Sequence, residues 1–318
     1  MNVITKLAVL TLALVSIFWA SVNGQVTKQS TTQTREKGLR CTYPRVEVVS
    51  RQLFIVNGKN VESPVSLTEY TICDEQRRIV ESGELLNGDP DTKRISRYDE
   101  DGNEIEHEYW IQDSLNHKSV SRYDRDGRMI SQDYDDGTKA RCQRMKKQSL
   151  CKLFDENGHL KKRWRITFDS HRREIQRLEF EAPRPDNRYV YAYDPWGNRS
   201  VEAHYYHDDG KERSSREFFT FDEKGKLLQK LWYDDTGLRT REVYEYNNRH
   251  DLTRRTEYNA DKIVVEQVTL EYQSYDSKGN WTKAVETRIR SDKGKTTLDI
   301  RRVLYRTITY PSSTLATS

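Results

Sequence analysis

The sequence predicts an all-β protein in which tandem antiparallel β-hairpins form a meander, folded as a twisted, elongated sheet. Two observations lead to this prediction. A turn with the pattern aromatic-Asp-x-x-Gly recurs along most of the chain. Aromatic residues are also abundant, with 19 Tyr, 8 Phe and 6 Trp on a background that is 33% charged. Such residues suit thin sheets, where a tyrosine ring packs while its hydroxyl stays in water.

The repeated turn has a physical explanation. An Asp at the start of a turn accepts hydrogen bonds from later backbone N–H groups, and Gly supplies the positive φ that closes the turn. Its copies are Tyr98, Asp99 and Gly102; Tyr123, Asp124 and Gly127; Phe154, Asp155 and Gly158; Tyr193, Asp194 and Gly197; Phe221, Asp222 and Gly225; Tyr233, Asp234 and Gly237; and Tyr275, Asp276 and Gly279. Degenerate copies of the pattern occur at Tyr134, Phe168, Tyr206, Tyr246 and Tyr258.

The spacing of these turns defines the strands. The aromatics lie ~12 or ~25 residues apart, which leaves about eight residues for each strand. In the stretch from Lys226 to Tyr233, alternation predicts that Leu227, Leu231 and Tyr233 share one face and Trp232 lies on the other. A helical alternative is poor, because Gly or Asx turns interrupt almost every dozen residues.

The N-terminus resembles a secretory signal. Lys6 precedes an apolar run from Leu7 to Ala20, and small residues at Val22 and Gly24 suit cleavage before Gln25. We expect residues 1–24 to be a signal peptide, 25–40 a flexible lead, 41–310 the β-hairpin repeat domain and 311–318 a disordered tail. The apolar run is too short to span a bilayer as a helix, so no transmembrane segment is expected in the mature chain.

The four cysteines, Cys41, Cys73, Cys142 and Cys151, fit an exported chain. An even number of cysteines in such a protein favours disulfides. The nearest-neighbour pairing, Cys41 with Cys73 and Cys142 with Cys151, is one of three possible pairings. Their spacing matches no zinc motif.

The charges are nearly balanced overall but segregate locally. The net charge of +4 argues against nucleic-acid binding. Residues 97–138 hold twelve acidic and five basic side chains, whereas residues 139–177 hold four acidic and thirteen basic ones. Oppositely charged strands that pair across the sheet explain this segregation. A basic patch of Lys161, Lys162, Arg163 and Arg165 that recognises an acidic glycan is the alternative.

No catalytic, cofactor-binding or metal-binding residues are predicted. The acidic turns lack the ligand spacing of a calcium loop. His204 and His207 lie three apart on a strand, and therefore on opposite faces. No nucleophile elbow, phosphate-binding glycine loop or zinc motif is present, so we expect a protein that is not an enzyme.

The segment from Tyr193 to Asn198, Tyr-Asp-Pro-Trp-Gly-Asn, resembles the YD repeats of bacterial rearrangement-hotspot (RHS) proteins. This resemblance extends over roughly Leu67 to Tyr310. It implies a short, secreted, YD-type bacterial protein without a toxin domain, located in the periplasm, at the cell surface or outside the cell. The function expected is structural or interactive, displaying the sheet to an unknown protein or glycan at the cell surface. A binder of acidic glycans and an enzyme of unknown type are the alternatives.

Overall fold

The computed structural model describes residues 43–180, 185–208, 211–292 and 295–310, and these residues form twenty strands. The strands are β1 (Arg45–Val56), β2 (Lys59–Cys73), β3 (Ile79–Leu86), β4 (Asp89–Tyr98), β5 (Glu104–Ile111), β6 (Ser114–Tyr123), β7 (Met129–Tyr134), β8 (Lys139–Arg144), β9 (Gln148–Phe154), β10 (Leu160–Phe168), β11 (Glu174–Phe180), β12 (Pro185–Tyr193), β13 (Arg199–Asp208), β14 (Lys211–Phe221), β15 (Leu227–Asp234), β16 (Gly237–Tyr246), β17 (Leu252–Asn259), β18 (Val264–Tyr275), β19 (Trp281–Asp292) and β20 (Lys295–Thr309). Within the described ranges, no helix is long and apolar enough to cross a membrane.

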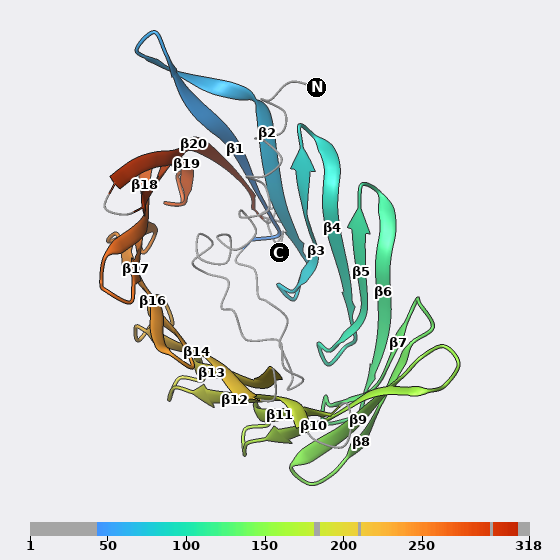
Figure 1. Cartoon of the computed structure of the whole chain (residues 1–318). Helices are drawn as coiled ribbons and strands as arrows, with labels where there is room; N and C mark the ends of the chain where they lie inside the picture. Colours follow the sequence, from blue (N-terminus) through green and yellow to red (C-terminus); the bar gives the residue numbers. More distant parts are fainter. Residues whose placement is uncertain (1–42, 181–184, 209–210, 293–294, 311–318) are drawn as a thin grey trace, which may run out of the picture.

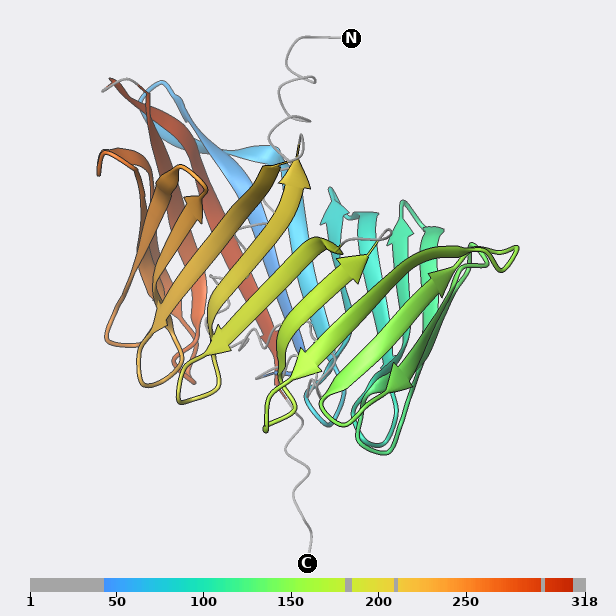
Figure 2. The ribbon, with the colours of Figure 1, turned by 60° about the horizontal axis from the view of Figure 1, so that its bottom comes forward.

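The twenty strands form one closed antiparallel barrel, with each strand paired to its neighbours in sequence (Figures 1 and 2). The predicted all-β antiparallel meander is confirmed, but the prediction of a twisted, elongated sheet is wrong, because the sheet closes on itself. Strands β1 and β20 pair in eight successive positions, from Arg45↔Thr309 to Gln52↔Arg302. Closure satisfies backbone groups that would otherwise lie at two free sheet edges.

The barrel has two rims with different turns. The hairpins that follow the even-numbered strands β2 to β18 meet at one rim, which we call the aspartate rim, because eight of these nine turns begin with Asp or Asn. In the turn after β4, the Asp99 amide N–H donates to the Asn103 carbonyl (3.0 Å), and Asp99 Oδ1 accepts from the Asn103 N–H (2.8 Å). A spacing of ~25 residues therefore marks one pair of strands, which returns the chain to the same rim.

The fourth residue of this turn has a positive φ whether or not it is glycine. Gly102 and Gly225 have φ values of 84° and 79°. In three degenerate copies the same position is occupied by Arg172, His250 and Lys262, with φ values of 64°, 68° and 62°; the turn with Lys262 lies at the opposite rim. The backbone requirement is therefore kept even where the sequence motif is lost.

The main hydrophobic cluster lies on one face of the strands from β16 to β1. Its buried members are Val48, Tyr244, Leu252, Val268, Leu270, Trp281, Ala284 and Leu304. Leu227 packs against the same cluster. This placement differs from the predicted alternation, because a bulge sets two residues of β15 opposite Phe221 and moves Leu227 to the other face.

Disulfides join the described cysteines. Cys142 and Cys151 lie directly opposite one another on β8 and β9 and form a disulfide with a Cα–Cα distance of 4.0 Å. Cys73 is disulfide-bonded as well. Cys41, the expected signal peptide, the flexible lead and the tail at 311–318 lie outside the described residues.

Candidate functional site

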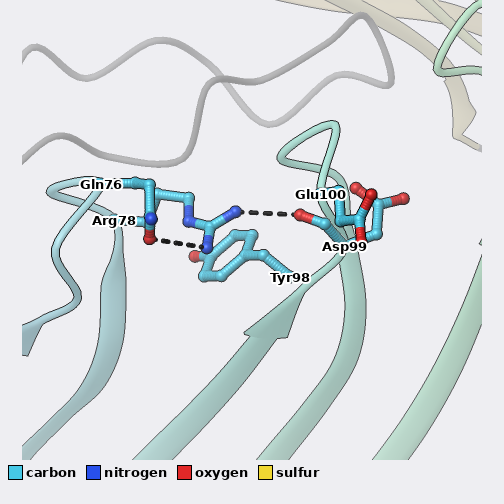
Figure 3. Close-up of a pocket in the computed structure, with 5 residues that line it drawn as sticks. All are labelled: Gln76, Arg78, Tyr98, Asp99 and Glu100. Carbon is cyan, nitrogen blue, oxygen red and sulfur yellow. Dashed lines mark hydrogen bonds between the residues drawn. The ribbon is translucent and has the colours of Figure 1, made fainter.

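The aspartate rim holds a recess between the turns that follow β2 and β4 (Figure 3). It has a volume of about 340 Å³ and is lined by Gln76, Arg78, Tyr98, Asp99 and Glu100. The Arg78 guanidinium donates to Asp74 Oδ2 (2.6 Å) and to the Asp99 carbonyl (3.0 Å), and it lies 4.8 Å above the Tyr98 ring. The guanidinium donors of Arg78 are therefore used in hydrogen bonds within the rim. Arg78 links neighbouring turns and does not present a free positive charge to the recess.

The same arrangement recurs around the rim. The last tyrosine of an even-numbered strand donates its hydroxyl to the carbonyl of the first residue of the preceding strand. These bonds are Tyr98 to Ile79, Tyr123 to Glu104, Tyr193 to Glu174 and Tyr246 to Leu227, at 2.8–2.9 Å. In β18 the donor is Tyr272, three residues before the last tyrosine, and it donates to the Leu252 carbonyl at 2.7 Å. A basic side chain also covers the ring in two of the other copies, Arg173 over Tyr193 and Lys226 over Tyr246. These hydrogen bonds join successive hairpins along the aspartate rim and have a structural role. We call this set of bonds the rim ladder.

The face that carries these tyrosines is the more buried face of the sheet. In β6, His117, Ser119, Ser121 and Tyr123 are buried or half-buried, whereas the alternate residue Val120 is exposed. Six of the seven largest fully buried side chains lie on the tyrosine face: Trp281, Ile166, Glu174, Glu286, Val268 and Cys151. Side chains converge on the concave side of a closed sheet and diverge on its convex side. We therefore assign the tyrosine face as the inner wall of the barrel.

On the inner wall of β11, β12 and β13, aromatic rings contact one another beside charged side chains. The His204 ring stacks on Tyr189, with ring centroids 4.4 Å apart and planes within 2°, and it also contacts Tyr206 at 5.1 Å. His204 Nε2 lies 2.8 Å from Asn187 Oδ1. Burial lowers the pKa of His204, so the ring is neutral at pH 7 and stacks without carrying a charge.

Arginine and carboxylate side chains form ion pairs next to these rings. Arg199 lies 4.1 Å from the centre of the Tyr191 ring and donates to Glu202 at 2.8 Å. Arg177 donates through two nitrogens to both oxygens of Glu174, at 3.1 and 3.2 Å. Burial raises the pKa of Glu174, although Arg177 acts in the opposite direction. We call the inner-wall residues of β11 to β13 the aromatic wall.

Charges are paired on both faces of the barrel. On the inner wall, Arg255 donates to Glu242 at 3.0 Å and Arg290 to Glu266 at 3.0 Å. On the outer face, Lys118 joins Glu106 and Glu108, at 2.7 and 2.9 Å. Cross-strand pairing thus accounts for many of the charges that the sequence separates along the chain.

The predicted basic patch is divided by strand alternation. Arg163 and Arg165 of β10 lie on the outer face, whereas Lys162 lies on the inner wall and binds Glu179 at 2.6 Å. Lys161 is exposed beside a bulge at the start of the strand. The structure therefore does not bring the four side chains together on one face.

The predicted turn residues lie at both rims. Those beginning at Asp99, Asp124, Asp194, Asp222 and Asp276 are at the aspartate rim, whereas the turns at Asp155 and Asp234 are at the opposite rim.

The aromatic wall was not predicted from the sequence. The sequence feature that could have revealed it is the alternation of Tyr189, Tyr191 and Tyr193, which places three rings on one face of a strand. Among the residues described by the structure, no group of three His, Cys, Asp or Glu side chains is arranged to hold a metal ion.

Comparison with known proteins gives no family. No family model matches the chain, and no curated protein matches it. Solved structures with some likeness include a porin-like protein from Bacteroides uniformis, with 11% identity, 86% of this chain and 100% of that chain covered, and a TM-score of 0.36. The TcdB2-TccC3-TEV structure has 10% identity, covers 83% and 18%, and has a TM-score of 0.32. A DUF1329 family protein from Desulfovibrio piger has 12% identity, covers 86% and 88%, and has a TM-score of 0.22.

The resemblance to YD-repeat and RHS proteins is therefore corrected. The repeats close into one barrel after twenty strands, and the chain matches no family model. The Tyr-Asp pattern reflects a turn that recurs at eight of the nine hairpins of the aspartate rim. Because the TM-scores of these three structures are below 0.5, their likeness to this chain supports no inference about function.

Proposed function

We propose that this chain is an exported interaction protein whose barrel binds an extended polypeptide along its inner wall. The observation that carries the proposal is the aromatic wall, where Tyr189 stacks on His204, Tyr206 contacts the same imidazole, and paired arginines and carboxylates lie beside these rings. Stacked rings offer flat apolar surface, and the polar groups beside them offer hydrogen bonds to a peptide backbone. The proposal is for a binding role and includes no catalytic step.

Other ligand classes fit this wall less well. An acyl chain would require a continuous apolar surface, but Glu174, Arg177, Arg199 and Glu202 interrupt the wall. A polyanion would require an excess of positive charge, yet these arginines are each paired with a carboxylate. A polypeptide, which carries apolar, polar and charged groups together, matches the mixed composition.

Export is supported by the disulfides. The Cys142–Cys151 bond, together with the disulfide at Cys73, suits an oxidising compartment, because cytosolic thiols are kept reduced. We propose the bacterial periplasm or envelope as that compartment. Intact-mass analysis of the protein from its native host tests this: a mature chain that starts near Gln25 supports export, and a reduced chain that starts at Met1 contradicts it.

Binding is tested with a permanently unfolded chain, reduced and carboxymethylated lactalbumin, labelled for fluorescence anisotropy. We expect Tyr189→Ala combined with Tyr206→Ala to weaken binding about fivefold or more, since each lost ring contact contributes about 0.5–1.5 kcal/mol. The matched control is Tyr205→Ala, because Tyr205 lies on the outer face of the same strand, under Arg188. Equal losses in both variants, or displacement of the chain by a fatty acid, would contradict the proposal.

A further inference from the structure

The hairpin of β1 and β2 extends beyond the rest of the barrel wall (Figure 1). Strand β1 pairs with β2 as far as Val56↔Lys59, but its pairing with β20 ends at Gln52. Strand β2 in turn pairs with β3 only from Leu67 onward. The outer part of the hairpin therefore has two edges that are not covered by a neighbouring strand.

The hairpin tip also exposes large apolar side chains. The exposed fractions are 69% for Ile55, 50% for Val56, 47% for Phe54 and 45% for Val61. These side chains occupy both faces of the hairpin, because Phe54 and Val61 face one another across the strands and Ile55 points to the opposite side. Apolar residues gathered in this way on a soluble surface mark an interaction site.

The two edges of the hairpin differ. On β2, Pro64 lacks an N–H, and the register between β1 and β2 shifts beside it, which displaces residues 63–65 from regular pairing. A proline and a bulge are the devices that protect a sheet edge from added strands. On β1, the run from Leu53 to Val56 contains neither proline nor charge. The β1 edge is therefore the open one.

The hydrogen-bonding groups at this edge can be assigned. Asn57 and Gly58 have φ values of 51° and 76°, which define a two-residue turn. The flanking pair, Val56 and Lys59, then exchanges backbone hydrogen bonds, and the next pair does not. The N–H and C=O of Ile55 consequently point away from β2, toward the side on which pairing with β20 has already ended at Gln52.

We propose that the free edge of β1, from Leu53 to Val56, takes an added β-strand from a partner polypeptide that is apolar in its centre and acidic at its ends. Backbone hydrogen bonds to Ile55 supply the pairing, and apolar side chains on both faces of the hairpin supply contacts for alternate partner residues. Lys59, on the turn side of this edge, and Arg301, which donates to Asn60 at 3.0 Å, give the site its positive flanks.

The positive charges of Lys59 and Arg301 favour a separate strand with acidic ends over a second copy of this chain. Two copies of this edge, paired about a twofold axis, would bring Lys59 and Arg301 of both chains toward one another, and like charges disfavour that arrangement. A bilayer would leave the unpaired backbone groups of the β1 edge without hydrogen bonds. A separate strand with acidic ends satisfies both requirements. This site is distinct from the aromatic wall and does not depend on it.

The test uses a fluorescent ten-residue peptide with alternating valine and threonine in its centre and aspartate at both ends, titrated into the full chain. We expect Ile55→Pro, which removes the edge donor but no bond to β2, to weaken binding about tenfold or more. The matched control, Ile55→Val, should bind within about twofold of the unchanged chain, because it keeps the donor. Loss of binding in both variants, or in neither, would overturn the assignment of the edge.

A second variant covers the case in which proline disturbs the hairpin. Lys59→Glu should reverse the preference, so that a peptide with lysine ends binds more tightly than the one with aspartate ends. An unchanged preference contradicts the charge argument. Two other outcomes would assign the edge to another partner: a concentration-dependent dimer that Ile55→Pro abolishes, or binding to phosphatidylglycerol vesicles that the peptide does not displace. The variant with both Tyr189→Ala and Tyr206→Ala should bind this peptide normally, which separates this site from the proposed inner-wall function.

Discussion

Gly225 provides a quantitative test of the turn that builds the aspartate rim. It has φ +79°, and a Cβ at this position would meet only the side chain of Asn198, at 3.6 and 3.9 Å. Space is therefore not limiting, and the cost of a side chain is conformational. An L-residue in this region costs about 1–2 kcal/mol, and a strained position up to about 3 kcal/mol. We expect Gly225→Val to lower the free energy of opening of the β14–β15 hairpin by about 2–3 kcal/mol.

Hydrogen–deuterium exchange measures this opening directly. Because each 1.4 kcal/mol is a factor of about ten, amides of β14 and β15 should exchange roughly 30- to 150-fold faster. Strands β4 and β5, on a distant part of the barrel, should keep their protection, since each strand contacts mainly its neighbours. Gly225→Asn is the matched control and should have a smaller effect, because Asn tolerates positive φ.

Lys262 allows the reciprocal experiment. It occupies the equivalent turn position with φ 62° and is exposed. Lys262→Gly should relieve about 1–2 kcal/mol of strain and lose about 0.5–1 kcal/mol to the greater freedom of the unfolded chain. Urea unfolding should therefore show a small net gain in stability. Unchanged exchange in Gly225→Val together with a loss of stability in Lys262→Gly would refute the turn assignment, and a uniform loss of protection would refute local opening.

Three further predictions follow from other contacts. Tyr246→Phe removes the hydrogen bond to the Leu227 carbonyl and should cost about 1 kcal/mol in urea unfolding; no change would mean that the rim ladder does not contribute to stability. Replacing both Cys142 and Cys151 by serine opens a loop with a sequence separation of 9 and should cost about 2.5 kcal/mol, which reduction of the unchanged chain should reproduce. Burial, and then Glu84, raise the pKa of Glu69 to about 8, so the folded chain retains a proton that the unfolded chain has lost. Stability should therefore fall as pH rises from about 4.5 to 8, and Glu69→Gln should reduce this fall between matched urea titrations at pH 4 and pH 9.

The hairpin pattern could be predicted because its causes are local. An Asp at the start of a turn and a residue of positive φ at its fourth position act within five residues, so the ends of strands such as β4 and β14 follow from the sequence near Asp99 and Asp222. Closure of the barrel could not be predicted in this way. It depends on the pairing of Arg45 with Thr309, and nothing in either segment alone specifies the other.

Three features of the structure could not be predicted from strand alternation alone. Strand alternation predicts Leu227 on the face of Leu231, but a bulge next to the turn at Asp222 moves Leu227 to the inner cluster. The same register shift occurs beside the turns at Asp99 and Asp124, so it belongs to the turn and not to the alternation of the strand. The open edge of β1 depends on where its neighbour stops pairing, which is a property of two strands distant in sequence. The rings of the aromatic wall were visible as alternating tyrosines on β12, but their stacking with His204 required the register with β13.

The reach of the rim tyrosines limits how the size of such a barrel can change. Each of these hydroxyl contacts joins the end of one strand to the start of the strand before it, so a complete unit is one hairpin of about 25 residues. Duplication or deletion of a whole unit would leave every rim contact, every inner-wall alternation and the β1–β20 seam intact. Loss of a single strand would instead reverse the direction of β20 and prevent antiparallel closure. The circumference can therefore grow or shrink only in steps of two strands.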